Sequence, residues 1–138
     1  MAEAPEGRGL LDTSVVIALG ELDPALLPDR TSISALTLAE LTSGTYAASD
    51  DRERARRQDR LQRYEGEVES LPFDPNCARA YGLIYAAITA HGRKARGARA
   101  VDLMIAATAL AHALPLYTMN AEGMRGLGGL LEVVDIGS

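Results

Sequence analysis

Three acidic residues lie in parts of the sequence that are otherwise apolar: Asp12, Glu40 and Asp102. Asp12 interrupts the run Leu-Leu-Asp-Thr-Ser-Val-Val-Ile at residues 10–17. A run this apolar is typical of a buried strand that leads into a helix. An ionised carboxylate there is costly unless a cation or hydrogen-bond donors meet it. Asp12 therefore predicts a partner, and a cation shared with the other two acids is the first candidate.

The elements expected around these acids alternate between short strands and helices. The pattern predicts strands at residues 9–12, 31–34, 115–118 and 131–136, a short strand or turn at 71–73, and helices over 15–20, 36–48, 52–71, 76–91 and 101–113. This alternation predicts an α/β fold with a short, mostly parallel sheet and helices on both faces. In such a sheet the strand ends and helix starts share one edge, so we expect all three acids to point toward it.

Three carboxylates gathered at one edge would repel one another without a cation. Oxygen ligands of this kind suit Mg²⁺ or Mn²⁺, which keep several bound waters. Such an ion can orient a water and neutralise the charge of a phosphodiester. The sequence therefore predicts that Asp12, Glu40 and Asp102 are metal ligands and catalytic residues.

Each of these residues also has a purely structural interpretation. Thr37 and Glu40 have the spacing of a capping box, in which the glutamate bonds a backbone N–H. Asp102, expected in a first helical turn, would favour the helix dipole, and Asp12 would cap the helix that follows it. Ser14 either helps to order a metal-bound water or phosphate, as an additional ligand, or caps the same helix.

A run of cations comes shortly before Asp102, at Arg93, Lys94, Arg96 and Arg99. Beside an acidic metal site this run would bind RNA phosphates, and the alternative is a solvated loop. The net charge of -5 offers no general attraction for nucleic acid, so a polyanion needs this local patch or a metal ion. The arginines between residues 52 and 63 are interleaved with acids, which indicates a solvated helix face with ion pairs one turn apart.

Length and composition describe one folded domain. The chain has 138 residues, of which 47% are apolar, and we expect a short disordered lead-in at 1–8 before a domain over 9–138. Cys77 is the single cysteine, so no disulfide can form within the chain, which fits a reducing cytoplasm. No apolar run is long enough for a membrane span, and we expect no membrane partner.

The ordered set of motifs resembles a PIN domain and, more narrowly, the VapC toxins of bacterial type II toxin–antitoxin modules. The motifs are Leu-Leu-Asp12-Thr-Ser, Leu-Ala-Glu40-Leu, Val-Asp102-Leu-Met-Ile-Ala-Ala and Leu-Tyr-Thr118-Met-Asn120. The resemblance implies a Mg²⁺- or Mn²⁺-dependent ribonuclease in which Asp12, Glu40 and Asp102 match the central acids. It also implies a VapB-type antitoxin partner and a homodimer.

One motif departs from the pattern of this family. Many relatives carry a further acid within Thr-x-Asn-x-x-Asp-Phe, and here Gly123 replaces that aspartate and Met124 the phenylalanine. Three interpretations remain: Asn120 serves as the additional ligand, Glu122 substitutes for it, or a second metal binds weakly.

The residues and the resemblance together predict an endoribonuclease in which a divalent ion activates water for in-line attack on an RNA phosphodiester. A first alternative is a catalytically weakened PIN module that only binds RNA or antitoxin, which the glycine at 123 favours. A second alternative is an aspartate-based phosphatase with Asp12 as nucleophile. Such an enzyme needs a second acid two residues further on, where this chain has Ser14.

Overall fold

A computed structural model describes residues 7–92 and 98–137 of the chain. Within these ranges, five parallel strands form one sheet in the order β3-β2-β1-β4-β5. The strands are β1 (Arg8–Leu11), β2 (Arg30–Ser34), β3 (Glu69–Leu71), β4 (Leu116–Thr118) and β5 (Val133–Asp135). The predicted parallel α/β fold is confirmed. The first strand starts at Arg8, which the sequence placed in the lead-in, and the rest of the predicted lead-in up to residue 6 lies outside the described residues.

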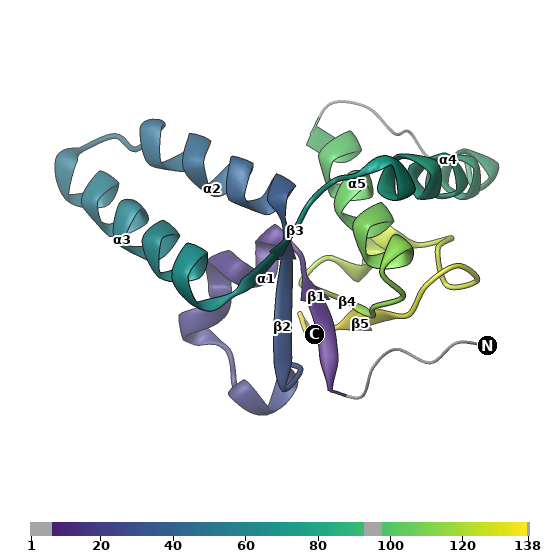
Figure 1. The fold of residues 1–138 in the computed structure, drawn as a ribbon, viewed down its shortest axis with the longest axis horizontal. Helices are drawn as coiled ribbons and strands as arrows, with labels where there is room; N and C mark the ends of the chain where they lie inside the picture. The colour runs from purple at the N-terminus through teal and green to yellow at the C-terminus, as the bar shows by residue number, and fades with distance from the viewer. Residues whose placement is uncertain (1–6, 93–97, 138) are drawn as a thin grey trace.

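Helices connect the parallel strands and cover both faces of the sheet, as Figure 1 shows. The α-helices are α1 (Thr13–Ala18), α2 (Ala35–Tyr46), α3 (Asp51–Glu67), α4 (Pro75–Ala90) and α5 (Ala98–Ala111). Short 3-10 turns are η1 (Leu19–Glu21), η2 (Pro24–Leu26) and η3 (Ala121–Met124). In Figure 1, α2 and α3 lie on one side of β1 and β2, and α4 and α5 lie on the other.

Successive residues of β1 point to opposite faces of the sheet and so enter two different hydrophobic clusters. Leu10 packs in a cluster with Ile84 of α4 and Leu103 of α5. Leu11 packs in the other cluster with Val15 of α1 and Ile33 of β2. All six side chains are 0–1% exposed, so the central strand is buried from both sides. A strand with no solvated face explains why the sequence around it is apolar without alternation.

The predicted helix over 52–71 was too long. α3 ends at Glu67, Val68 is already extended, and Glu69–Leu71 pair in parallel with β2. Leu61, Tyr64, Val68 and Leu71 follow the helical spacing of three and four residues, but only the first three share one cluster, and Leu71 packs in the cluster of α4 and α5. The backbone N–H and C=O groups at the free edge of β2 form hydrogen bonds with residues 69–71, and this pairing ends the helix before Pro72. The spacing of apolar residues in α3 contains no information about this partner.

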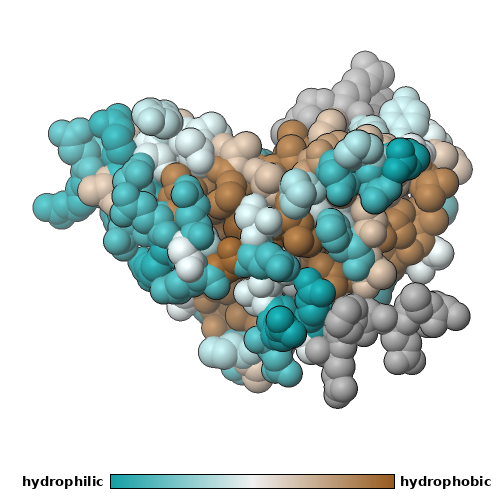
Figure 2. All heavy atoms as spheres, viewed as in Figure 1, coloured by the Kyte–Doolittle hydropathy of each residue, from teal (hydrophilic) through white to brown (hydrophobic). Residues whose placement is uncertain are grey.

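The solvated face predicted for α3 is confirmed. Arg57 pairs with Glu53 and Arg63 pairs with Asp59, each four residues apart, at 2.9 and 2.8 Å. In Figure 2 the hydrophilic residues gather over α3, at the left of the molecule. Exposed pairs of this kind stabilise a helix by only about 0.3–0.5 kcal/mol each, so α3 is attached mainly through its apolar stripe around Leu61.

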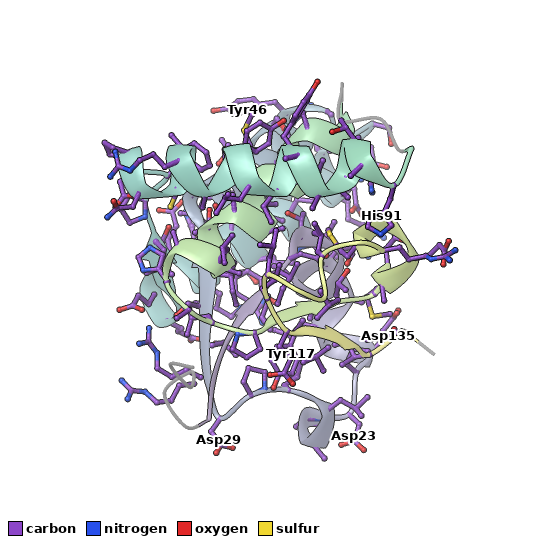
Figure 3. All side chains as sticks on the ribbon, turned by 90° about the vertical axis from the view of Figure 1, so that its right-hand side faces the viewer. Asp23, Asp29, Tyr46, His91, Tyr117 and Asp135 are labelled. Carbon is purple, nitrogen blue, oxygen red and sulfur yellow. The ribbon has the colours of Figure 1, made fainter. Side chains whose placement is uncertain are left out.

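The loop after η3 lies against the C-terminal end of α4. Gly126 has a φ of 97°, and a Cβ at that position would be 2.9 Å from Nδ1 of His91. Figure 3 shows His91 at the end of α4, beside this loop. A glycine is needed here both for the backbone angle and for the close approach. The close approach places the loop that follows η3 against the C-terminal end of α4.

The helix predicted over 76–91 is confirmed as α4. Its residues Ile84 and Ile88 are fully buried, whereas Tyr85 is 49% exposed. No helix in the described parts of the chain combines the length and hydropathy that crossing a membrane requires.

Candidate active site

Asp12 lies at the end of β1, where the strand order of the sheet reverses. β1 stands between β2 and β4, and ligands of open parallel sheets bind where the strand order reverses, beyond the carboxyl ends of the strands. The backbone N–H of Asp12 donates to the carbonyl of Tyr117 at 3.0 Å, which ties the end of β1 to β4. The residue is only 8% exposed, so its carboxylate is held in a largely dry position.

The Asp12 carboxylate caps α1, as its structural interpretation predicted. Its Oδ1 accepts the hydroxyl of Ser14 and, at 3.3 Å, the backbone N–H of Val15. Both bonds reach the same oxygen, which leaves Oδ2 without a donor in the described ranges. A capping role and a ligand role are therefore compatible in this residue, because a carboxylate has two oxygens that each accept more than one bond.

Glu40 is held by a hydroxyl and not by a capping box. α2 begins at Ala35, with Ser34 as its N-cap, so Glu40 lies in the second turn and the capping-box interpretation is wrong. Its Oε1 accepts the hydroxyl of Thr13 at 2.5 Å, and that hydroxyl lies 3.1 Å from the hydroxyl of Thr37. The first residue of α1 thus orients the acid of α2 toward the end of β1.

Asp102 shares an electrostatic environment with the other two acids. Burial raises the pKa of its carboxyl above the ordinary value, Glu40 and Asp12 raise the pKa further, and Arg99 lowers it by the smallest contribution. Since α5 begins at Ala98, Asp102 lies just beyond the first turn in which the sequence placed it. The mutual repulsion shows that the fold brings carboxylates from β1, α2 and α5 toward one edge.

The three acids do not converge into a tight cage. Within residues 7–92 and 98–137, no group of three His, Cys, Asp or Glu side chains is arranged closely enough to hold one metal ion. Mg²⁺ usually keeps several waters and binds proteins through one or two carboxylates. The three acids therefore fit a divalent ion that is held partly through water. Such an ion would also relieve the repulsion of Asp102 by Glu40 and Asp12, which raises the pKa of the Asp102 carboxyl.

Ser14 connects two strand ends across the sheet edge. Its hydroxyl donates to the Asp12 carboxylate and accepts the backbone N–H of Met119 at 3.2 Å. Met119 directly follows β4, so one hydroxyl links the ends of β1 and β4. The hydroxyl uses its donor and one of its two acceptor positions in these bonds, which fits a role in positioning the carboxylate.

Two of the residues proposed as an additional ligand, Asn120 and Glu122, lie on or beside η3, next to Gly123, which replaces the acid of many relatives. Asn120 is exposed and caps η3, its Oδ1 accepting the N–H of Gly123 at 3.3 Å. Glu122 is exposed, and its Oε1 accepts from Arg125 at 3.1 Å. Gly123 is buried, and its carbonyl accepts from the guanidinium of Arg99.

The predicted basic run is only partly described. Arg93, Lys94 and Arg96 lie outside the described residues. Arg99 belongs to the first turn of α5, not to a loop, and it is half-buried. Of the four cations, it is therefore the one that the structure places at the acidic edge.

Sequence reasoning missed the hydroxyls that orient the acids. The sequence indicates a hydroxyl or a helix cap at Thr13 and a capping box at Thr37, whereas in the structure Thr13 donates to Glu40 and contacts Thr37. One usable signal was present, because Thr37 is a polar residue on the apolar side of α2 and is fully buried. A buried hydroxyl requires a hydrogen-bond partner, and the nearest candidates are those on the same sheet edge.

An open parallel sheet with acids at its switch point defines the class of protein. The sequence matches the family model described as PIN domain over residues 9–126, and the chain belongs to the PIN domain family. Among curated relatives, it is 40% identical over 117 residues to "Ribonuclease VapC5" of Mycobacterium tuberculosis, covering 83% of this chain and 84% of that protein. It is 36% identical over 111 residues to "Ribonuclease VapC8" of the same species, covering 79% and 96%.

The fold is also similar to a solved structure. The crystal structure of VapBC-5 from Mycobacterium tuberculosis, a member of the VapBC family of toxin–antitoxin systems, superposes with a TM-score of 0.78 at 36% identity. The match covers 94% of this chain and 99% of that one. The resemblance to VapC-type PIN domains is therefore confirmed.

Proposed function

We propose that this chain is a divalent-metal-dependent endoribonuclease whose site consists of Asp12, Glu40 and Asp102. The observation that carries the proposal is the repulsion among these acids at the switch point of the sheet, with the pKa of Asp102 raised by burial and by the other two. A fold gains nothing in stability from this repulsion, so a function that uses it is the better explanation. Relatives named as VapC ribonucleases support the same reaction class.

A bound Mg²⁺ or Mn²⁺ would supply charge neutralisation and a water of lowered pKa for in-line attack on a phosphodiester. The chain itself supplies orientation. Ser14 and the N–H of Val15 hold Oδ1 of Asp12, which would leave Oδ2 available as a ligand or as an acceptor for water. The hydroxyl of Thr13 donates to Oε1 of Glu40 at 2.5 Å and orients that carboxylate. Asp102 is the third acid and comes from α5.

The cations beside these acids would position the RNA backbone. Arg99 lies next to the acidic edge, and Arg93, Lys94 and Arg96 precede it by a few residues. Phosphate contacts of this kind fix the register of a substrate and carry no sequence information. The proposal therefore assigns RNA binding, and not RNA selectivity, to these residues.

The proposed biological setting is a toxin neutralised by a VapB-type antitoxin. The similarity to the VapBC-5 structure supports such a partner. A homodimer and a cytoplasmic location belong to the same proposal.

The direct test measures cleavage of bulk cellular RNA with Mg²⁺ or Mn²⁺ and with EDTA. We expect metal-dependent cleavage by the wild type and at least a hundredfold loss in both Asp12→Asn and Asp102→Asn, about 3 kcal/mol of transition-state stabilisation. Asp59→Asn is the matched control, because Asp59 is an exposed acid paired with Arg63 on α3. It should cleave like the wild type.

Undiminished cleavage in both site variants would overturn the proposed site. Millimolar Mn²⁺ should also raise the melting temperature of the wild type, and the rise should shrink in Asp102→Asn. An unchanged melting temperature would restrict the three acids to capping and packing roles.

A non-catalytic PIN module is the second candidate, favoured by the loose arrangement of the acids and by the glycine at 123. In that case RNA or an antitoxin peptide would bind, and no cleavage would be seen at any Mn²⁺ concentration. The phosphatase alternative is less favoured, because Ser14 occupies the place of its second acid and its hydroxyl is bound on both sides. A stable phospho-aspartate at Asp12 would restore it.

A further inference from the structure

Arg99 and Gly123 form a matched contact beside the acidic edge. The guanidinium of Arg99, from the first turn of α5, donates through Nη2 to the carbonyl of Gly123 in η3. The two residues are 24 positions apart in sequence, and both lie out of full solvent exposure. A half-buried arginine held by a backbone carbonyl has a defined position, unlike a solvated one.

The contact depends on the absence of a side chain at position 123. A Cβ placed there would lie 2.7 Å from Nη1 of Arg99 and 2.7 Å from Nδ2 of Asn120. These separations are too short for carbon against nitrogen, so any larger residue would displace the guanidinium. Gly123 has no positive φ that would itself require glycine, so its small size is the feature that matters.

The positive charge of the Arg99 guanidinium lies close to Asp102 and is not neutralised by an ion pair with a described residue. Arg99 lies three residues before Asp102 on α5, about one helical turn away, and it has no carboxylate within 4 Å among the described residues. One of its five N–H donors is used by Gly123. A positive charge is thus fixed one helical turn before Asp102, with no direct ion pair to a described carboxylate.

We propose that Arg99 is a built-in cation of the acidic edge, held in place because Gly123 has no side chain, and that it competes with the divalent ion while binding the RNA phosphate. This inference rests on the proposed nuclease function and adds a regulation of its metal affinity. A fixed charge near the acids reduces the attraction for Mg²⁺ or Mn²⁺. A planar guanidinium with unused donors matches a phosphate. The two ligands should therefore respond to Arg99 in opposite directions.

The test compares Arg99→Met and Gly123→Ala with two matched controls. Arg125→Met removes an exposed arginine next to η3, and Gly128→Ala adds a methyl group where no atom lies within 4 Å. Mn²⁺ affinity is measured by titration calorimetry without RNA. Affinity for a labelled single-stranded RNA is measured in EDTA, so that no cleavage occurs.

We expect Arg99→Met to bind Mn²⁺ about three to ten times more tightly than the wild type and to bind RNA at least threefold more weakly. Gly123→Ala should tighten Mn²⁺ binding in the same direction while keeping the net charge, because the methyl group displaces the guanidinium. Both control variants should match the wild type in Mn²⁺ affinity. A merely structural arginine would not produce opposite changes for the two ligands.

Unchanged or weaker Mn²⁺ binding in Arg99→Met would overturn the inference, as would equal effects of Arg99→Met and Arg125→Met. An unaffected Gly123→Ala would overturn the role of the glycine. Neither assay depends on catalysis. A wild type that binds Mn²⁺ and RNA without cleaving RNA would therefore refute the proposed nuclease activity, while the two affinities would still test the role of Arg99. Absence of Mn²⁺ binding in every variant at millimolar concentration would refute the competition.

Discussion

The hydroxyl of Ser14 offers the sharpest test of how the acidic edge is assembled. It donates to the Asp12 carboxylate and accepts the backbone N–H of Met119 at 3.2 Å, a residue 105 positions away. Ser14→Ala removes both bonds and introduces no steric conflict, because alanine is smaller. The variant therefore isolates the link between the ends of β1 and β4.

The expected loss follows from the two bonds. A hydrogen bond to a charged group contributes about 1.5–3 kcal/mol, and a buried N–H left without a partner costs about 1–3 kcal/mol. Ser14 is only half-buried, so water recovers part of each contribution. We expect Ser14→Ala to lower the free energy of unfolding by about 2–3 kcal/mol, or the melting temperature by roughly 10 °C.

The measurement is urea unfolding followed by circular dichroism, with the slope checked for two-state behaviour. Ser43→Ala is the control, because its exposed hydroxyl donates only to the carbonyl of Glu40 one turn back in α2. The control should change stability by less than about 0.5 kcal/mol. A loss of the same small size in Ser14→Ala would refute the idea that this hydroxyl links the two strand ends.

Two further predictions concern charge and packing. The folded state raises the pKa of the Asp102 carboxyl above its ordinary value of 3.8. The free energy of unfolding should therefore fall as the pH rises from about 3.8 through the pKa of the folded state. In EDTA, Asp102→Asn should therefore melt higher than the wild type at pH 7, and melting curves below pH 3.8 should show the gain disappear. Ile84→Ala, at a fully buried position between α4 and α5, should lose about 2–5 kcal/mol in urea unfolding, whereas Leu83→Ala at a 56% exposed position should lose less than about 1 kcal/mol. Equal losses at both positions would contradict the burial of this face.

Most of the fold was predictable because its signals are local. The apolar run around Asp12 indicated a strand buried on both faces, and the helices over 36–48, 76–91 and 101–113 were placed to within a few residues. β3 was missed as a full strand because its three residues continue the helical spacing of α3 and become a strand only by pairing with β2. A three-residue strand has too little sequence to carry a period of its own.

The candidate site divides in the same way. Asp12, Glu40 and Asp102 were recognisable as acids in apolar surroundings, and the sheet rule predicted their common edge. The groups that orient them were not recognisable, because Thr13 acts on an acid 27 residues away and Ser14 on a backbone N–H after β4.

The sequence by itself determined which residues carry charge into the buried sheet and that the fold is a parallel α/β domain, because period and composition are properties of short segments. Tertiary structure alone decided that these acids stay loosely spaced and that Arg99 rests on the backbone of Gly123 beside them. These are distances between segments far apart in the chain. They are set by how α5 and η3 pack around the sheet, and no local pattern encodes them.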